Sequence, residues 1–297
     1  MTTEQDTIDI RALPRMDLPQ SFSEPPPPID MVLPGLVCGT MGALVAMGGV
    51  GKSWVALQTA IAVAGGPDLI GMGVQRTGPV LYLPAEDPSI ALRHRLWAAG
   101  SRLTPPIREQ LYQSLEIVPL IGHVVDLLTP VWADALERMA EGRRLVVIDT
   151  LRRFHLGDEN SGGDMVRLLG TLEGICSRTG ATILFLHHTS KAAALNGGDQ
   201  QQASRGSSVL VDNIRGGQWN LVGMTEGEAG TYGVDPVRRR SYVRLLHAKT
   251  NYGEPPLDTW LRRDEGGLLV RAELERVGDG GQRQDERPHG GRRRTHG

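Results

Sequence analysis

The chain has 297 residues, of which 40% are hydrophobic, 22% are charged and 4% are aromatic. Its formal net charge of -2 excludes a global positive field that would attract nucleic acid, so any such binding must be local. The two cysteines, Cys38 and Cys176, lie far apart without CxxC spacing, which argues against a zinc cluster or a disulfide framework and favours free thiols.

The two ends of the chain differ in composition from its middle. Residues 1–30 are polar and end in the prolines at 25–28, which predicts a disordered, extended arm. Residues 278–297 are rich in Gly and Arg, so we expect a disordered tail. The N-terminal stretch lacks the apolar centre of a secretion signal, and no segment approaches the roughly 20 apolar residues that cross a bilayer. We therefore expect a cytoplasmic protein with no membrane partner and one core domain over residues 31–277.

Short apolar runs alternate with helical patterns along this core. Strands are predicted at 42–47, 79–85, 116–121, 144–149 and 181–188, and helices at 53–64, 88–99, 130–141 and 164–178. Two later segments, 213–224 and 241–253, are predicted to be added C-terminal strands. The alternation predicts an α/β fold whose mostly parallel central sheet is flanked by helices on both faces.

The first predicted strand leads into the motif AMGGVGKS, which consists of Ala46, Met47, Gly48, Gly49, Val50, Gly51, Lys52 and Ser53. Glycines let successive backbone N–H groups curl around an anion, and the start of a helix adds its positive dipole end. Lys52 is predicted to reach the β- and γ-phosphates, and Ser53 to hold Mg²⁺. The motif therefore predicts a P-loop, with ATP and Mg²⁺ as ligands and ATP hydrolysis as the chemistry. Ala46 departs from the strict pattern, which has glycine there, and the alternative is a glycine-rich turn that binds nothing.

Two carboxylates follow predicted strands. The strand in RRLVVIDT ends in Asp149, which is predicted to hold Mg²⁺ through water; the alternative is a turn-capping role. Thr150 comes next, so no second carboxylate there can activate water. The strand in PVLYLPA delivers Glu86 to the sheet edge where ligands bind, which predicts the general base. A helix N-cap is the alternative for Glu86 and the preferred interpretation for Asp87.

The strand ATILFLHH ends in two histidines, either of which could contact the γ-phosphate. We favour His188 over His187 as a sensor of that phosphate; the alternative is a histidine that only satisfies hydrogen bonds at the sheet edge. Residues 190–208 form a long polar segment that contains Lys191 and Arg205. Loops of this length are usually functional or disordered. If subunits formed a ring, this loop would contact DNA phosphates at its centre; otherwise it is a solvated loop.

Several basic residues are candidates for completing the active site of a neighbouring subunit, where charge develops on the γ-phosphate. They are Arg215, Lys249, Arg152 and Arg153. Spacing alone does not choose between them.

Six segments, taken together and in order, closely resemble the RepA-type hexameric replicative DNA helicase of broad-host-range plasmids. They are MGALVAMGGVGKS, GPVLYLPAEDPS, EGRRLVVIDTLRRFH, FLHHTSK, DQQQASRGSSVLVDNIR and KTNYG. The resemblance extends from about Pro28 to about Arg276 and implies a RecA-like P-loop NTPase assembled as a homo-oligomeric, hexameric ring. It further implies hydrolysis of ATP at subunit interfaces and translocation on single-stranded DNA, with unwinding during plasmid replication beside a replication initiator and a primase.

The same resemblance implies roles for individual residues. Glu86 would be the catalytic base and Asp149 the Walker B carboxylate, and His188 would be the γ-phosphate sensor. Arg215 would be the interface finger, and Tyr252, in KTNYG, would lie near the nucleotide. Glycines directly follow Arg215 in this chain, which departs from the family pattern, and the Gly/Arg tail matches nothing in it.

Two other functions use the same core. One is a nucleotide-gated regulator that binds DNA or a protein without unwinding, which the near-neutral charge favours. The other is a strand-exchange ATPase, which would form open filaments instead of closed rings.

Overall fold

The computed structural model describes residues 13–159, 161–188, 214–254 and 256–277. The chain divides into two units, residues 1–30 and 31–297. In the first unit, residues Leu18–Ser23 form a short helix, α1, where the sequence predicted only an extended arm. The helix begins there because the Asp17 carboxylate accepts a hydrogen bond from the backbone N–H of Gln20 at 3.0 Å, with a proline in the first turn.

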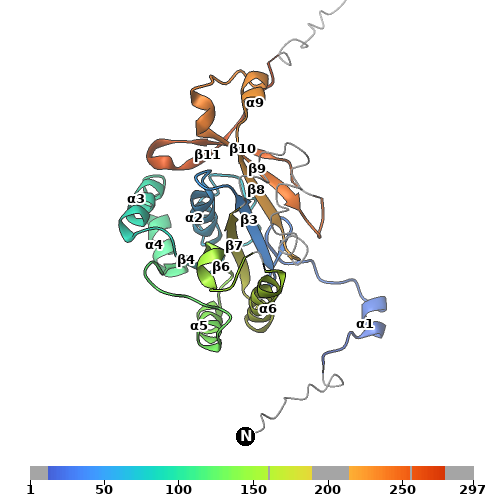
Figure 1. Cartoon of the computed structure of the whole chain (residues 1–297). Coiled ribbons are helices and arrows are strands. Elements are labelled where there is room, and N and C mark those ends of the chain that lie inside the picture. Colours follow the sequence, from blue (N-terminus) through green and yellow to red (C-terminus); the bar gives the residue numbers. More distant parts are fainter. Residues whose placement is uncertain (1–12, 160, 189–213, 255, 278–297) are drawn as a thin grey trace, which may run out of the picture. The chain divides into compact units, whose positions relative to one another are not determined.

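The second unit contains the remaining elements (Figure 1). Its strands are β1 (Met31–Leu33), β2 (Leu36–Val37), β3 (Met41–Ala46), β4 (Val80–Pro84), β5 (Leu115–Ile117), β6 (Leu145–Asp149), β7 (Thr182–His188), β8 (Gln218–Gly223), β9 (Tyr242–Lys249), β10 (Thr259–Arg263) and β11 (Leu269–Ala272). Its helices are α2 (Lys52–Val63), α3 (Ser89–Gly100), α4 (Pro105–Ser114), α5 (Pro130–Ala140), α6 (Gly162–Thr179) and α9 (Glu226–Thr231), with the 3-10 turns η2 (Leu151–Phe154), η4 (Arg238–Ser241) and η5 (Glu265–Gly267).

The central sheet has the strand order β11-β10-β9-β8-β3-β7-β6-β4-β5. The six strands from β8 to β5 run parallel, and β9, β10 and β11 extend the sheet in antiparallel fashion. The predicted fold class, a mostly parallel sheet between helices with added C-terminal strands, is confirmed.

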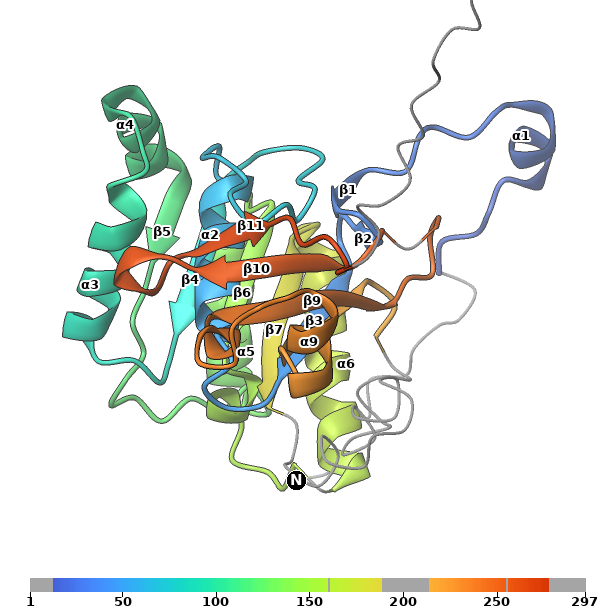
Figure 2. The ribbon, with the colours of Figure 1, turned by 90° about the horizontal axis from the view of Figure 1, so that it is seen from above.

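Helices cover both faces of the parallel strands (Figure 2). Along β3, Leu44 and Ala46 pack with α2, α3 and α4, whereas Ala43 and Val45 pack with α5 and α6. This alternation explains why the parallel strands are continuous apolar runs in the sequence: successive side chains point to opposite faces, and both faces are buried.

Between β4 and α5 the structure differs from the prediction at two places. Helix α4 was missed because only Leu111 of its residues is buried, so the sequence carries little apolar periodicity. Strand β5 ends at Ile117 instead of residue 121, because Pro119 has no N–H to donate to the ladder. None of the helices in the described parts of the chain combines the length and the apolar composition that crossing a bilayer requires.

Candidate active site

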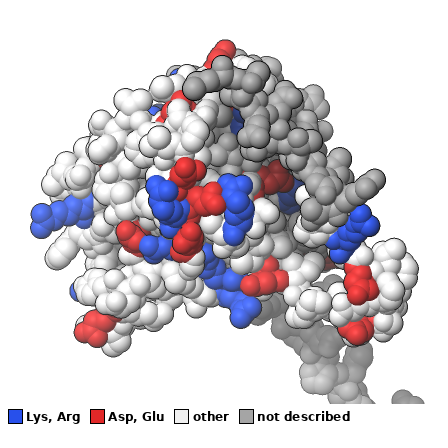
Figure 3. All heavy atoms as spheres, turned by 90° about the horizontal axis from the view of Figure 1, so that it is seen from below, with Lys and Arg blue, Asp and Glu red and all other residues white. Residues whose placement is uncertain are grey.

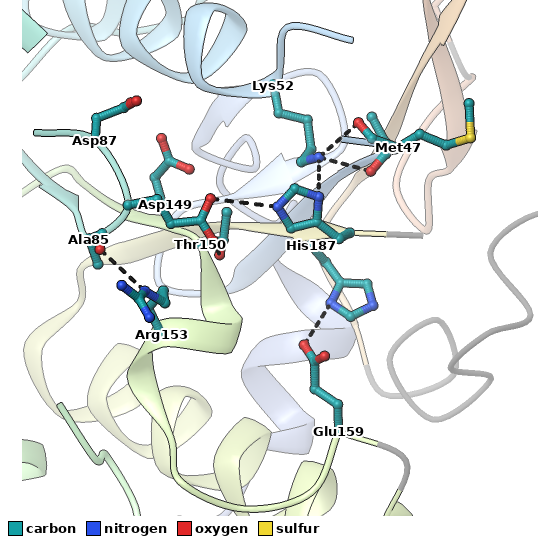
Figure 4. A network of polar contacts seen from close by, with 12 residues as sticks. Met47, Lys52, Ala85, Asp87, Asp149, Thr150, Arg153, Glu159 and His187 are labelled. Carbon is teal, nitrogen blue, oxygen red and sulfur yellow. Dashed lines mark hydrogen bonds and ion pairs between the residues drawn. The ribbon is translucent and has the colours of Figure 1, made fainter. Parts of the chain in front are cut away.

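The carboxyl ends of four parallel strands meet at one edge of the sheet. In register, Ala46 at the end of β3 pairs with His188 at the end of β7, and Pro84 on β4 pairs with Asp149 at the end of β6. Glu86 lies two residues beyond Pro84. The fold therefore brings together Lys52, Glu86, Asp149 and His188, which lie far apart in the sequence. Figure 4 shows Lys52 and Asp149 in this network.

The P-loop connects β3 to α2. Gly49 and Gly51 have φ values of 78° and 120°, which side chains rarely adopt. Among the described residues, no acceptor binds the backbone N–H groups of residues 48–53; the first helical N–H to be bonded is that of Trp54, to the Gly51 carbonyl at 3.1 Å. This row of free donors at a helix N-terminus suits an anion such as a nucleotide phosphate.

The departure from the P-loop pattern at Ala46 has a simple structural explanation. Ala46 is still the last residue of β3, in extended backbone that alanine adopts without strain. The tight part of the loop begins only after Met47, where the glycines lie.

Lys52 is buried, and its ammonium group forms hydrogen bonds within the site. Its Nζ donates to the carbonyls of Ala46 at 2.8 Å and Met47 at 3.1 Å, and lies 2.9 Å from Nδ1 of His188. Burial lowers the pKa of Lys52 to about 8, against the opposing charges of Asp149 and Glu86. A bound phosphate would give the Lys52 ammonium group an anionic acceptor in place of these neutral carbonyls.

Asp149 is 2% exposed, and the hydroxyl of Tyr82 donates to its Oδ2 at 2.6 Å. Burial raises the pKa of Asp149, while Tyr82 and the nearby Ser53 hydroxyl lower it. Its Oδ1 is buried without a hydrogen-bond partner among the described residues. The free Oδ1 of Asp149 and the hydroxyl of Ser53 are both oxygen ligands of the kind that Mg²⁺ prefers, so together they fit a Mg²⁺ site.

The rest of a magnesium shell would have to come from outside the chain. No group of three or more His, Cys, Asp or Glu residues able to hold a metal occurs in the described part of the chain. Mg²⁺ commonly binds through one or two protein oxygens together with phosphates and waters. Ser53 and Asp149 therefore fit a nucleotide-dependent Mg²⁺ site and not a permanent one.

Glu86 is half-exposed at the mouth of the site. Its Oε1 accepts a hydrogen bond from the Thr150 hydroxyl at 2.8 Å, and its Oε2 lies 3.7 Å from Nε2 of His188. His188 chiefly, with Thr150 and Arg153, lowers the pKa of Glu86 to about 2 against the opposing effect of burial. Glu86 is thus a well-oriented carboxylate but a weak proton acceptor while His188 lies beside it.

The interpretation of Asp87 as a helix N-cap was wrong. Helix α3 begins at Ser89 with Pro88 as its N-cap, and no side chain caps it. Asp87 instead forms a two-pronged ion pair with Arg95, whose guanidinium lies 5.9 Å from the centre of the Trp54 ring. A fixed guanidinium fork is a stronger partner for a carboxylate than a helix N-terminus.

The two histidines of β7 point to different places. His187 is largely buried, its Nδ1 lies 3.7 Å from Oε1 of Glu159, and burial lowers its pKa to about 4 (Figure 4). His188 is 41% exposed at the side-chain level and lies between Lys52 and Glu86. Of the two, only His188 is placed to contact a phosphate held by Lys52.

Arg215 and Tyr252 lie at the opposite edge of the sheet from the P-loop. Arg215 precedes β8, where the N–H of Gly216 donates to the carbonyl of Met41 at the start of β3. Asn251, next to Tyr252, donates to the Arg215 carbonyl at 2.9 Å. The length of β3, on the order of 15 Å, separates this edge from the P-loop of the same chain.

The other basic candidates have local partners or cannot be placed. Arg153 donates to the carbonyl of Ala85 at 3.3 Å, and Arg152 to that of His155 at 3.1 Å. Lys191 and Arg205 lie outside the described residues, as does the predicted tail at 278–297.

Sequence reasoning missed Arg263, whose guanidinium donates to the P-loop carbonyls of Gly49, at 3.2 Å, and Val50. In the sequence, the one feature that marks this residue is the pair Arg262 and Arg263 at the end of a possible strand. Nothing in that local pattern indicates a partner more than 200 positions away.

The face of the molecule in Figure 3 agrees with the near-neutral composition. On the face shown in Figure 3, acidic and basic side chains are interspersed, and the described atoms there form no large patch of one sign. The described residues of this face therefore form no positive patch of the kind that attracts nucleic acid.

The fold and the site define a RecA-like P-loop ATPase. A family model described as an AAA domain, AAA_25, matches residues 10–194, and the chain belongs to this family. Solved structures agree on the fold. A KaiC-like protein from the hyperthermophilic archaeon Pyrococcus horikoshii OT3 has a TM-score of 0.54 at 14% identity, covering 83% of this chain and 100% of that chain. The RadB recombinase has a TM-score of 0.52 at 14% identity, covering 80% and 93%.

Proposed function

We propose that this chain is a RepA-type, ATP-dependent replicative DNA helicase, a hexameric ring that moves along single-stranded DNA and unwinds duplex. The observation that carries the hydrolytic part is the convergence of Lys52, Asp149 and Glu86 from three strands at one sheet edge. The helicase part rests on the ordered set of six motifs that resemble that family.

The described residues divide the chemistry as follows. The free N–H groups of the P-loop and Lys52 bind the phosphates, and Ser53 and Asp149 hold Mg²⁺, which polarises the β- and γ-phosphate oxygens when it is bound. Glu86, fixed by Thr150, orients the attacking water. Once Lys52 binds phosphate, His188 is released to contact the γ-phosphate, which removes the main cause of the low pKa of Glu86.

A ring explains the position of Arg215 and Tyr252. Both lie a strand length from the P-loop of their own chain, beyond the reach of a side chain. In a head-to-tail ring, the far edge of one subunit faces the nucleotide edge of the next, so both residues would complete the site of a neighbour. Lys191 and Arg205 would contact DNA phosphates at the centre, and an initiator and a primase are the proposed partners.

The test is unwinding of a forked DNA duplex in the presence of ATP and Mg²⁺. We expect unwinding by the wild type, none by Lys52→Ala, and ATP binding without hydrolysis by Glu86→Gln. Glu109→Gln, an exposed substitution on α4, is the matched control and should behave as wild type. Native mass spectrometry with ATP and single-stranded DNA should give a hexamer.

Two outcomes would favour the other functions. ATP-dependent DNA binding without unwinding would indicate a nucleotide-gated regulator, and open filaments with strand exchange would indicate a recombinase. The likeness to the RadB recombinase concerns the fold, and it does not favour that alternative over the helicase.

A further inference from the structure

The C-terminal hairpin of β10 and β11 packs on the P-loop helix α2 (Figure 2). The buried Gln58 of α2 donates to the carbonyl of Leu269 at 2.7 Å and accepts from its N–H at 3.0 Å, as a paired strand would. At the hairpin turn, Asp264 forms an ion pair with Arg102, and Gly267 fits against the Trp54 indole. The buried Gln58 bonds and the Trp54 contact fix the end of β10 beside the P-loop, whereas the partly exposed ion pair adds little to this attachment.

Arg263 ends β10 at this place and has an unusual environment. Its guanidinium donates to the Gly49 and Val50 carbonyls, and no acidic side chain among the described residues pairs with it. Burial, with no compensating anion, lowers its pKa. Gly51 is also required here: a Cβ at that position would lie 3.0 Å from the guanidinium. A half-buried guanidinium whose acceptors are neutral carbonyls contributes little to fold stability, because carbonyls offset only part of the free energy that desolvating a charge costs.

The two carbonyls that Arg263 holds determine where the P-loop donors point. In a planar trans peptide, C=O and N–H point in opposite directions. Fixing the carbonyls of Gly49 and Val50 toward Arg263 therefore turns the N–H groups of Val50 and Gly51 toward the other side. Those N–H groups belong to the row that has no acceptor among the described residues.

We propose that Arg263 is a positioning residue for nucleotide phosphates: by holding the Gly49 and Val50 carbonyls, it orients the Val50 and Gly51 N–H groups toward the phosphate that the P-loop binds. The inference rests on nucleotide binding by this loop, which is part of the proposed function. It assigns to the C-terminal hairpin a role in binding any nucleotide with a β-phosphate, and no role in sensing the γ-phosphate.

The experiment measures the affinity for ADP and for AMP by calorimetry, together with kcat and KM for ATP. Arg263→Ala should weaken ADP binding and raise KM by about tenfold or more, as expected for the loss of charged hydrogen bonds, while kcat stays within about twofold. AMP, which lacks the β-phosphate, should bind the variant and the wild type alike. Arg263→Lys, which keeps the charge but loses the fork, should fall between them.

Two matched controls separate positioning from loss of structure. Arg262→Ala changes the neighbouring exposed arginine on the other face of β10, and Asp264→Asn breaks the hairpin's ion pair; both should bind ADP as wild type. Unchanged ADP affinity in Arg263→Ala overturns the proposal, as does a fall in kcat alone or an equal loss in Asp264→Asn. ADP binding requires neither DNA nor a ring. The role of Arg263 can therefore be tested by ADP affinity even if the chain turns out not to unwind DNA.

Discussion

Nζ of Lys52 lies 2.9 Å from Nδ1 of His188, and Nε2 of the same ring lies 3.7 Å from Oε2 of Glu86. An ammonium group can only donate, so Nδ1 is the acceptor and the ring proton is on Nε2, facing the carboxylate. One imidazole thus connects Lys52, the proposed phosphate-binding residue, to Glu86, the residue proposed to orient water. In the proposed mechanism, phosphate binding at Lys52 would remove one end of this connection and free His188 to turn toward the γ-phosphate.

Replacing His188 with alanine should therefore reduce hydrolysis more than binding. We expect kcat to fall by roughly 10- to 100-fold, the range typical of a positioned polar group, and ADP affinity to stay within about threefold. Steady-state kinetics and ADP calorimetry check this. His123→Ala is the control, because His123 is exposed and, among the described residues, its side chain forms no hydrogen bond or ion pair with Lys52, Glu86 or His188. A variant with unchanged kcat would show that His188 only satisfies hydrogen bonds.

Thr150 stands where a second carboxylate could have been, and its hydroxyl holds Glu86 at 2.8 Å. Thr150→Val keeps the shape but removes the donor, so Glu86 should lose its orientation and kcat should fall by about tenfold. Thr150→Ser keeps the hydroxyl and should retain most of the activity. Single-turnover hydrolysis by the three proteins measures the difference, and equal loss in the Val and Ser variants would indicate packing as the cause.

The lowered pKa of Lys52 predicts the pH dependence of nucleotide binding. Burial brings its pKa to about 8, below the ordinary lysine value of 10.5, so the amine begins to lose its proton just above neutral pH. Phosphate binds the protonated form; ADP affinity should be constant below pH 8 and fall by up to tenfold per pH unit above it. Calorimetry between pH 6.5 and about 9.5 tests this. Lys52→Arg should bind more weakly but without this pH dependence, because arginine stays protonated.

The same sign argument applies to Glu86 and acid stability. Its folded-state pKa of about 2 lies below the ordinary value of 4.5, so the carboxylate stabilises the fold above pH 4.5. This contribution is lost as the pH falls from 4.5 toward 2, and Glu86→Gln should flatten the decline in melting temperature over that interval. Solvent screens a half-exposed carboxylate, so the expected difference is small, and an unchanged slope would contradict the assignment of the low pKa to Glu86.

Gln58 provides a test of how firmly the C-terminal hairpin is attached. Gln58→Ala would leave the buried N–H and C=O of Leu269 unpaired, which should lower the free energy of unfolding by about 2–4 kcal/mol in urea titrations. Gln75→Ala, at an exposed position, should change it by less than about 0.5 kcal/mol. If both variants unfold alike, the hairpin is not held by Gln58.

The sequence was informative where one short segment carries the whole signal. The P-loop motif, the strand ending in Asp149 and the strand leading to Glu86 are each local, and their convergence follows from the rule that ligands bind at the carboxyl ends of parallel strands. The contact of Arg263 with Gly49 joins residues 214 positions apart and has no local pattern. Asp87 was misassigned for a related reason: a helix N-terminus is visible in the sequence, whereas the competing partner Arg95 becomes visible only after the helix is built.

Arg215 gives the sharpest test of the ring, because its position rules out a contribution to the P-loop of its own chain. Arg215→Ala subunits keep an intact P-loop, and Lys52→Ala subunits keep an intact Arg215, so neither homogeneous protein should hydrolyse ATP at the normal rate. In an equal mixture of ring-forming subunits, roughly a quarter of the interfaces combine the two intact halves. Hydrolysis should therefore recover toward a quarter of the wild-type rate, as measured by phosphate release after the proteins are mixed and reassembled.

Arg238→Ala, an arginine of η4, replaces Arg215→Ala in the control mixture, where activity should follow the fraction of intact P-loops. A mixture that recovers nothing would place Arg215 outside the catalytic interface and remove the main structural support for hydrolysis between subunits.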